Sequence, residues 1–217
     1  MPLTGRYRAV IFDMDGLLLD TEGLWDRAEG ELFRRHGDAW TFEDKLAVMG
    51  TSFETSARYY ADRLGEPAER GPALVDEMRT LMKAELERRV DAHPGAVKLV
   101  ARVRDLGGVG LGLASNSSRE LVDVALRKAG LDGAFDAIVT ADDVVNAKPA
   151  PDIYLRACSL LGVPPSEALA LEDTAPGIAA AKAAGLTCIA VPQFAETDVS
   201  MADRVVSSLE DLLASDL

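Results

Sequence analysis

Cysteine and histidine are scarce in this chain, and their scarcity narrows the possible chemistry. Only two cysteines occur in 217 residues, Cys158 and Cys188, and they lie far apart without the spacing of metal ligands. Each stands among apolar neighbours, so we predict two reduced cysteines in the core. The two histidines, His36 and His93, lie away from every motif described below, which argues against a histidine-based mechanism.

Long apolar runs are also missing from the sequence. The N-terminal apolar run is short and ends in acidic residues, and no stretch of 18 consecutive apolar residues occurs. A soluble, cytoplasmic protein with no membrane partner is therefore expected. Hydrophobic residues still make up 48% of the chain, which is enough to fill the core of one large domain or of one domain that carries a smaller insert.

Basic side chains are too few for a partner with many phosphates. The chain has 23 Lys and Arg against 36 Asp and Glu, a formal net charge of −13, and no large basic cluster. This field repels a phosphodiester backbone, so we expect no nucleic-acid partner. One lysine and one divalent cation can outweigh the diffuse field inside a pocket. We therefore expect a monomer that binds a small phosphorylated metabolite.

The most informative feature that is present is a pair of aspartates at the end of an apolar run. The run Ala9–Phe12 is typical of a strand buried on both faces, and Asp13, Asp15 and Gly16 follow it directly. Open α/β sheets bind ligands at this end of their strands. Both carboxylates can face one site only if the chain is already turning, which Gly16 permits. An acidic surface turn fits residues 13–16 about equally well on their own.

The spacing of hydrophobic residues changes twice along the rest of the chain. Residues 20–91 show helical spacing and no convincing strand, whereas after the turn signal at 93–95 helices and strands alternate. This predicts an α/β protein with a Rossmann-like, doubly wound parallel sheet, formed by residues 1–19 and 92–217, and an inserted all-helical cap of residues 20–91. The expected later strands are 109–114, 137–139, 168–171 and 187–191, and the expected helices are 96–106, 119–129, 151–161 and 176–184.

Polar residues follow three of the later strands as well. Ser115 and Asn116 stand before a predicted helix N-terminus, Lys148 is held in an extended segment by Pro149, and two acids, Glu172 and Asp173, come after another strand. Taken singly, Ser115 and Asn116 are more often part of a helix cap and turn, and an isolated lysine is usually a solvated surface residue. One of the two acids could be a capping residue. Together, two pairs of acids at one sheet edge call for a hard cation, and Mg²⁺ suits carboxylates and phosphate best.

Four segments stand in the order and spacing of one known family. They are FDMDGLLLDTE, ASNSSRE, AKPAPDIY and LEDTAPGIAAAKAAG. The chain thereby resembles the haloacid dehalogenase-like hydrolases, in the phosphatase and β-phosphoglucomutase branch with a helical cap. The resemblance implies that Asp13 is the nucleophile and Asp15 the general acid and base. It also implies that Ser115 and Lys148 hold the phosphate. The implied magnesium site consists of Glu172, Asp173, Asp13 and the backbone carbonyl of Asp15.

The cap loop distinguishes activities within that branch. A mutase of this kind is expected to carry basic residues where this chain has Met49 and Phe53. We therefore expect a magnesium-dependent phosphatase for a sugar or polyol phosphate, acting through an aspartyl phosphate, with Asn116, Thr21, Gly50 and Phe53 as substrate contacts. Phe53 fits the core of the cap equally well, and Lys45 or Arg58 could supply the missing cation. A β-phosphoglucomutase-like mutase and a non-catalytic phosphometabolite-binding protein are the alternatives.

Overall fold

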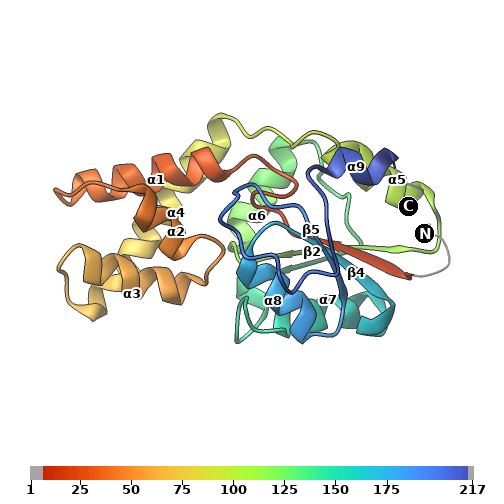
Figure 1. The fold of residues 1–217 in the computed structure, drawn as a ribbon. Helices are drawn as coiled ribbons and strands as arrows, with labels where there is room; N and C mark the ends of the chain where they lie inside the picture. Colours follow the sequence, from red (N-terminus) through yellow and green to blue (C-terminus); the bar gives the residue numbers. More distant parts are fainter. Residues whose placement is uncertain (1–6, 215–217) are drawn as a thin grey trace.

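A computed structural model describes residues 7–214 and contains a six-stranded sheet whose paired strands all run parallel (Figure 1). The strand order is β3-β2-β1-β4-β5-β6, so the first strand is central and the order reverses beside it. In such doubly wound sheets ligands bind beyond the strand ends at this reversal. The bounds are β1 Ala9–Phe12, β2 Gly110–Ser115, β3 Ala137–Thr140, β4 Ala168–Glu172, β5 Thr187–Ala190 and β6 Arg204–Val205.

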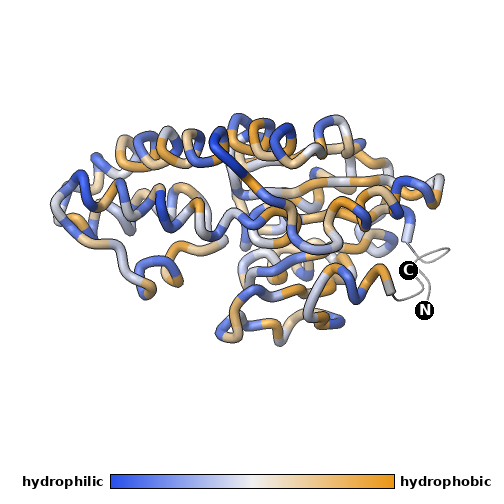
Figure 2. Tube along the Cα trace, turned by 90° about the horizontal axis from the view of Figure 1, so that it is seen from above, coloured by the Kyte–Doolittle hydropathy of each residue, from blue (hydrophilic) through white to orange (hydrophobic). Residues whose placement is uncertain are grey.

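Helices cover both faces of the sheet. Because alternate residues of β1 point to opposite sides, this strand contributes side chains to the packing on both faces. Val10 and Phe12 pack on the face with α5, α6 and α9, while Ala9 and Ile11 pack on the face with α7 and α8 (Figure 1). The most hydrophobic stretches of the tube run through the middle of this part, where the strands lie (Figure 2). The helix bounds are α5 Ala96–Asp105, α6 Arg119–Lys128, α7 Asp152–Leu161, α8 Ala175–Ala183 and α9 Leu209–Ala214.

Between β1 and α5 the described chain forms four α-helices, seen at the left of Figure 1. Thr41 and Asp44 form a reciprocal capping box at the start of α2, and Ser52 caps α3. An apolar stripe that includes Leu24, Ala28 and Leu32 is buried on α1. The bounds are α1 Glu22–Arg35, α2 Phe42–Val48, α3 Phe53–Arg63 and α4 Gly71–Arg88, with short 3₁₀ turns at Ala68–Arg70, Ala141–Asp143 and Pro165–Glu167.

The predicted elements of the sheet part are confirmed, and each observed bound differs from its prediction by at most one residue. The edge strand β6 and the helix α9 were not predicted. β6 has only two residues, both exposed, so it shows neither an apolar run nor alternation. Its pairing with β5 decides its structure, and that pairing is invisible in the sequence.

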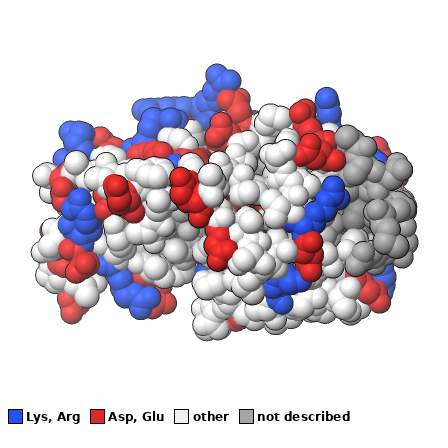
Figure 3. Space-filling model, viewed as in Figure 1, with Lys and Arg blue, Asp and Glu red and all other residues white. Residues whose placement is uncertain are grey.

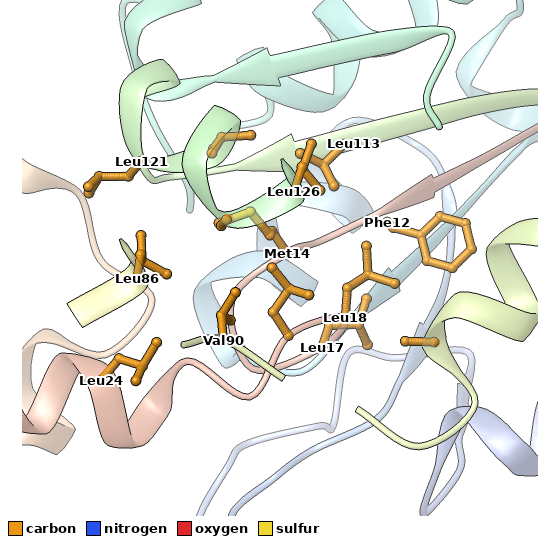
Figure 4. Close-up of a cluster of buried hydrophobic side chains, with 14 of the residues drawn as sticks. Phe12, Met14, Leu17, Leu18, Leu24, Leu86, Val90, Leu113, Leu121 and Leu126 are labelled. Atoms are coloured by element: carbon orange, nitrogen blue, oxygen red, sulfur yellow. The ribbon is translucent and has the colours of Figure 1, made fainter. Parts of the chain in front are cut away.

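The helical insert joins the sheet part through two adjacent backbone segments, residues 18–20 and 91–93. The Asp20 amide donates to the Asp91 carbonyl at 2.9 Å, and the His93 amide donates to the Leu18 carbonyl at 2.8 Å. A single cluster of buried side chains runs across this junction (Figure 4). It includes Leu24 and Leu86 from the insert, Leu17 and Leu18 from the turn after β1, and Leu121 and Leu126 from α6. The two parts therefore share one hydrophobic core.

Two further expectations concern the core and the surface. Cys158 and Cys188 are buried and free, as predicted. Within residues 7–214 no helix combines the length and apolar character needed to cross a membrane. On the face drawn in Figure 3, Lys and Arg lie interspersed with Asp and Glu.

Candidate active site

The turn after β1 brings both aspartates to one cavity. The amide of Asp13 still donates to the Leu171 carbonyl at 3.0 Å, as if β1 continued, and the chain then turns at Gly16 with φ +77°. A Cβ at Gly16 would overlap the carboxylate of Asp173, so both the backbone angle and the available space require glycine here. Asp13 and Asp15 both line the cavity, as the sequence predicted.

Lys148 joins the carboxylates of two strand ends. Its Nζ donates to Asp13 Oδ1 at 2.5 Å, to Glu172 Oε1 at 2.6 Å and to the Ala114 carbonyl at 2.8 Å. Its side chain is 2% exposed, so it is a buried functional group and not a surface lysine. Burial alone would lower the pKa of Lys148, but the charges of Asp13 and Glu172 outweigh burial and raise it. The lysine is therefore a fixed positive charge.

The side-chain amide of Asn116 fixes the backbone around that lysine. Its Oδ1 accepts from the Lys148 amide at 2.9 Å, and its Nδ2 donates to the Lys148 carbonyl at 3.1 Å. The same Nδ2 lies 3.1 Å from the carbonyl of Gly50, in the loop between α2 and α3. The Asn116 side chain thus links the backbone of Lys148 to the loop between α2 and α3.

Three carboxylates form a cluster that could hold a metal ion. Ligand oxygens of Asp13, Glu172 and Asp173 all lie within 4.8 Å of one another, and all three residues are buried. Burial raises the pKa of Asp13 despite Lys148, and burial together with the charge of Asp13 raises the pKa of Asp173. A single lysine therefore leaves negative charge in excess.

Two oxygens of this cluster are left without a hydrogen bond from the protein. Among the described residues, Glu172 Oε2 and Asp173 Oδ1 are buried side-chain atoms with no partner. Buried acceptors of this kind normally have partners, and a cation would supply one. The other oxygen of Glu172 accepts from Tyr154 at 2.5 Å as well as from Lys148, and no room exists for a Cβ at Gly177 beneath the carboxylate. The donor set and its unused oxygens fit a hard, oxygen-preferring cation.

Asp15 sits in a different environment, held by four hydroxyl and indole donors. Thr21 Oγ1 and Trp25 Nε1 donate to its Oδ1 at 2.9 and 3.2 Å, and Ser117 and Ser115 hydroxyls donate to its Oδ2 at 2.8 and 3.3 Å. Two donors come from the start of the cap, one from the last residue of β2 and one from the loop after it. The carboxyl orientation is consequently set by both parts of the protein.

The remaining predicted contacts divide between the cavity and the surrounding structure. Asn116, Gly50 and Phe53 line the cavity, whereas Ser115 and Thr21 are fully buried beside Asp15 and are not among its lining residues. Phe53 fits both expectations, a substrate contact and a residue of the cap core, because it lines the cavity and also packs against the shared core. That Ser115 and Thr21 contact substrate stays a prediction.

The two possible replacement cations have different surroundings. Lys45 lines the cavity, but its Nζ lies 3.1 Å from Glu22 Oε2 and 2.9 Å from Asp26 Oδ2. Arg58 has a side chain that is 70% exposed, pairs with Glu54, and does not line the cavity. Of the cavity-lining residues that the structure describes, Lys45 is the only lysine or arginine, and its charge is already balanced.

Sequence reasoning missed several cavity residues. Trp25 and Glu29 lie on α1 at helical spacing from Glu22, and Tyr60 and Met78 come from α3 and α4. The i, i+3 and i+7 spacing on α1 was available as a signal, but the direction of that helix face depends on how the cap docks. The cavity has a volume of about 90 Å³ and is lined by Asp13, Asp15, Glu22, Trp25, Glu29, Lys45, Val48, Met49, Gly50, Thr51, Phe53, Ser56, Tyr60, Met78, Asn116, Ser117 and Thr174.

The comparisons with known proteins agree with the fold, a parallel sheet with a helical cap. The family model described as haloacid dehalogenase-like hydrolase matches residues 7–185. The chain belongs to this family. Its relatives and structural neighbours are members of this family with a helical cap, and several of the relatives are named as phosphatases. The chain is accordingly a phosphoric monoester hydrolase.

Individual relatives cover most of the chain. It is 37% identical over 193 residues to "Putative phosphatase YhcW" of Bacillus subtilis, covering 85% of this chain and 83% of the relative. It is 33% identical to "Hexitol phosphatase B" of Escherichia coli, with 96% of each covered. The crystal structure of CbbY from Rhodobacter sphaeroides in complex with phosphate has a TM-score of 0.84 at 30% identity, covering 95% of this chain and 96% of CbbY. Two longer Arabidopsis thaliana relatives are matched over 18% and 54% of their length.

Proposed function

We propose that this hydrolase cleaves a small phosphate monoester, a sugar or polyol phosphate, with Mg²⁺ and through an aspartyl phosphate on Asp13. The observation that carries the proposal is the contrast between two aspartates of one turn. Asp13 lies in the metal-capable cluster against Lys148, while Asp15 is held apart by neutral donors at the edge of the same cavity. One carboxylate is thus suited to attack and the other to proton transfer.

The first half-reaction follows from these positions. An Asp13 oxygen attacks phosphorus, and the bond from phosphorus to the leaving oxygen breaks. Lys148, fixed by Asn116, offsets the repulsion between an anionic nucleophile and an anionic phosphoryl group. A bound Mg²⁺ would be held by Asp13, Glu172, Asp173 and the backbone carbonyl of Asp15, and would supply further charge neutralisation for the transferring oxygens. Asp15 donates a proton to the departing alkoxide.

The second half-reaction reverses the role of Asp15. The same carboxyl, now deprotonated, takes a proton from water as that water attacks the aspartyl phosphate, which releases inorganic phosphate and restores Asp13. Trp25 and Thr21 anchor one oxygen of Asp15 from the cap side, so the carboxyl is aligned when the cap covers the site. In this proposal the core is formed by residues 1–19 and 92–217, and the cap by residues 20–91.

The cap end of the cavity favours hydrolysis over transfer to a second sugar phosphate. A mutase must hold a second phosphate opposite Asp13, and Lys45 is already paired with Glu22 and Asp26. A relative does bind such a ligand, since a CbbY mutant has been solved in complex with xylulose-(1,5)bisphosphate. The assay for this alternative supplies β-glucose 1-phosphate with a bisphosphate primer. We expect inorganic phosphate, and rapid isomerisation without phosphate release would favour the mutase.

The main test measures phosphate release from p-nitrophenyl phosphate with and without Mg²⁺. We expect turnover that excess chelator abolishes and that falls to background in Asp13→Asn, because an amide cannot form the phosphoenzyme. Asp132→Asn is the matched control, since Asp132 is exposed and lies outside the cavity. Undiminished turnover in Asp13→Asn, or full activity in chelator, would refute the proposal. Zero turnover of any phosphate monoester by the wild type would favour a binding protein.

A further inference from the structure

The cap side of the cavity contains a buried carboxyl that the proposed chemistry does not use. Glu29 lies on α1 and Tyr60 on α3, and both line the cavity at 5% and 1% exposure. The Tyr60 hydroxyl donates to Glu29 Oε1 at 2.7 Å. Carboxyl groups are rarely buried to this degree unless they are paired or needed for binding.

Half of the hydrogen-bonding capacity of this carboxyl is unused by the protein. Within the described part of the chain, Tyr60 is the only residue that hydrogen-bonds to Glu29. The second oxygen, Oε2, is not among the atoms sealed from solvent without a partner. Since Glu29 lines the cavity, Oε2 is the atom left for a ligand there.

A structural role alone does not explain the residue. Neighbouring positions on the same helix, Leu24, Ala28 and Leu32, are buried and apolar, so this part of α1 packs well without a polar group. A ligand hydroxyl in the cavity would give Oε2 the hydrogen-bond partner that the protein does not supply.

We propose that the Glu29 carboxyl, oriented by Tyr60, hydrogen-bonds a hydroxyl group of the leaving group and thereby selects polyhydroxylated monophosphates. This inference rests on the proposed phosphatase function, and it assigns the specificity of the same cavity to a named pair of residues.

The rest of the cap wall favours an uncharged leaving group. Val48, Met49 and Met78 are apolar, and Lys45 is balanced by Glu22.

The protonation state of Glu29 also suits a neutral hydroxyl. Burial raises the pKa of Glu29 to about 8, so the carboxyl is mainly neutral near pH 7. A neutral carboxyl accepts from Tyr60 at one oxygen and donates to the ligand from the other. A ligand amine would instead need a charged carboxylate.

The test compares a polyol phosphate with an aryl phosphate that has no hydroxyl. Sorbitol 6-phosphate and p-nitrophenyl phosphate are assayed with Mg²⁺ for the wild type, Glu29→Leu and Glu29→Gln. For Glu29→Leu we expect kcat/KM on the polyol phosphate to fall about tenfold, mainly through KM, and to fall less than about threefold on the aryl phosphate. Glu29→Gln should keep most of the polyol activity, because an amide also accepts at one atom and donates at the other.

The controls separate failure of the inference from failure of the proposed function. Glu54→Gln, whose side chain is 81% exposed on the same cap, should match the wild type on both substrates. Equal losses on both substrates in Glu29→Leu, or no loss on either, would overturn the role of Glu29 while phosphatase activity stands. Loss in Glu29→Gln as large as in Glu29→Leu would overturn hydroxyl recognition. Absence of turnover by the wild type on both substrates would instead refute the proposed function.

Discussion

Replacing Glu29 by Gln should change how the stability of the protein depends on pH. The pKa of Glu29 rises from 4.5 to about 8 on folding, mainly because burial disfavours the charged form. Between these values the folded state keeps a proton that the unfolded state has released. The stabilisation from this group is thus fully present below about pH 4.5 and is lost as the pH rises through about 8.

The size of the effect follows from the shift. Each pKa unit corresponds to about 1.4 kcal/mol, so the wild type should lose about 3 to 4 kcal/mol from this group between about pH 5 and pH 8. Glu29→Gln has no group to titrate. Relative to the wild type, the variant should gain this amount of unfolding free energy over the same range.

Urea unfolding followed by circular dichroism at several pH values measures the difference. Neighbouring groups that titrate or carry charge, Glu22, Asp26, Lys45 and Tyr60, are present in both proteins, so their contributions largely cancel in the difference. A single transition is expected, because the cluster in Figure 4 joins the cap to the sheet part. All samples contain chelator, which keeps metal binding out of the comparison.

Glu54→Gln should follow the wild-type pH dependence throughout, since that side chain is solvated. If the stability difference between the wild type and Glu29→Gln stays constant from about pH 5 to pH 8, the carboxyl is not held neutral by the fold.

Two further predictions concern the strand ends. Asp15→Asn should slow hydrolysis of alkyl phosphates by about 10² or more and of aryl phosphates much less, because a good leaving group hardly needs an acid; equal losses in steady-state assays would remove Asp15 from that role. Gly177→Ala should displace the Glu172 carboxylate and lower metal-dependent activity at least about tenfold. Gly30→Ala, where a Cβ meets open space on α1, should leave activity unchanged and serves as its control.

Residues of the sheet edge could be predicted from the sequence because their positions follow from topology. In a parallel sheet all carboxyl ends lie at one edge, so Asp13, Glu172 and the loop after β2 had to approach one another once the strands were identified. Lys148 is the instructive case. Its approach to Asp13 depends on Asn116 binding the backbone on both sides of the lysine. The pattern predicted a stiff segment but not this partner.

The cap wall could not be predicted in the same way. Helical spacing shows which residues share a face of α1, but not that one face turns toward the strand ends and carries Trp25 and Glu29 there. That orientation depends on long-range packing at the junction. For the same reason the sequence suggested Lys45 as a free cation, whereas folding places Glu22 and Asp26 against it.

In the proposed mechanism, the position of the insert couples the covering of the cavity by the cap to proton transfer by Asp15. Thr21 and Trp25 follow the crossing into the cap and hold one oxygen of Asp15, while Ser117 holds the other from the sheet part. Any displacement of α1 from the strand ends would take two of the four donors away from that carboxyl. Because an acid must be aligned with the leaving oxygen at the moment of bond cleavage, proton transfer is most efficient when the cap excludes water. In the proposed mechanism the acid, Asp15, is linked to the cap because the insert begins at residue 20, so that Thr21 and Trp25 lie within reach of its carboxyl group.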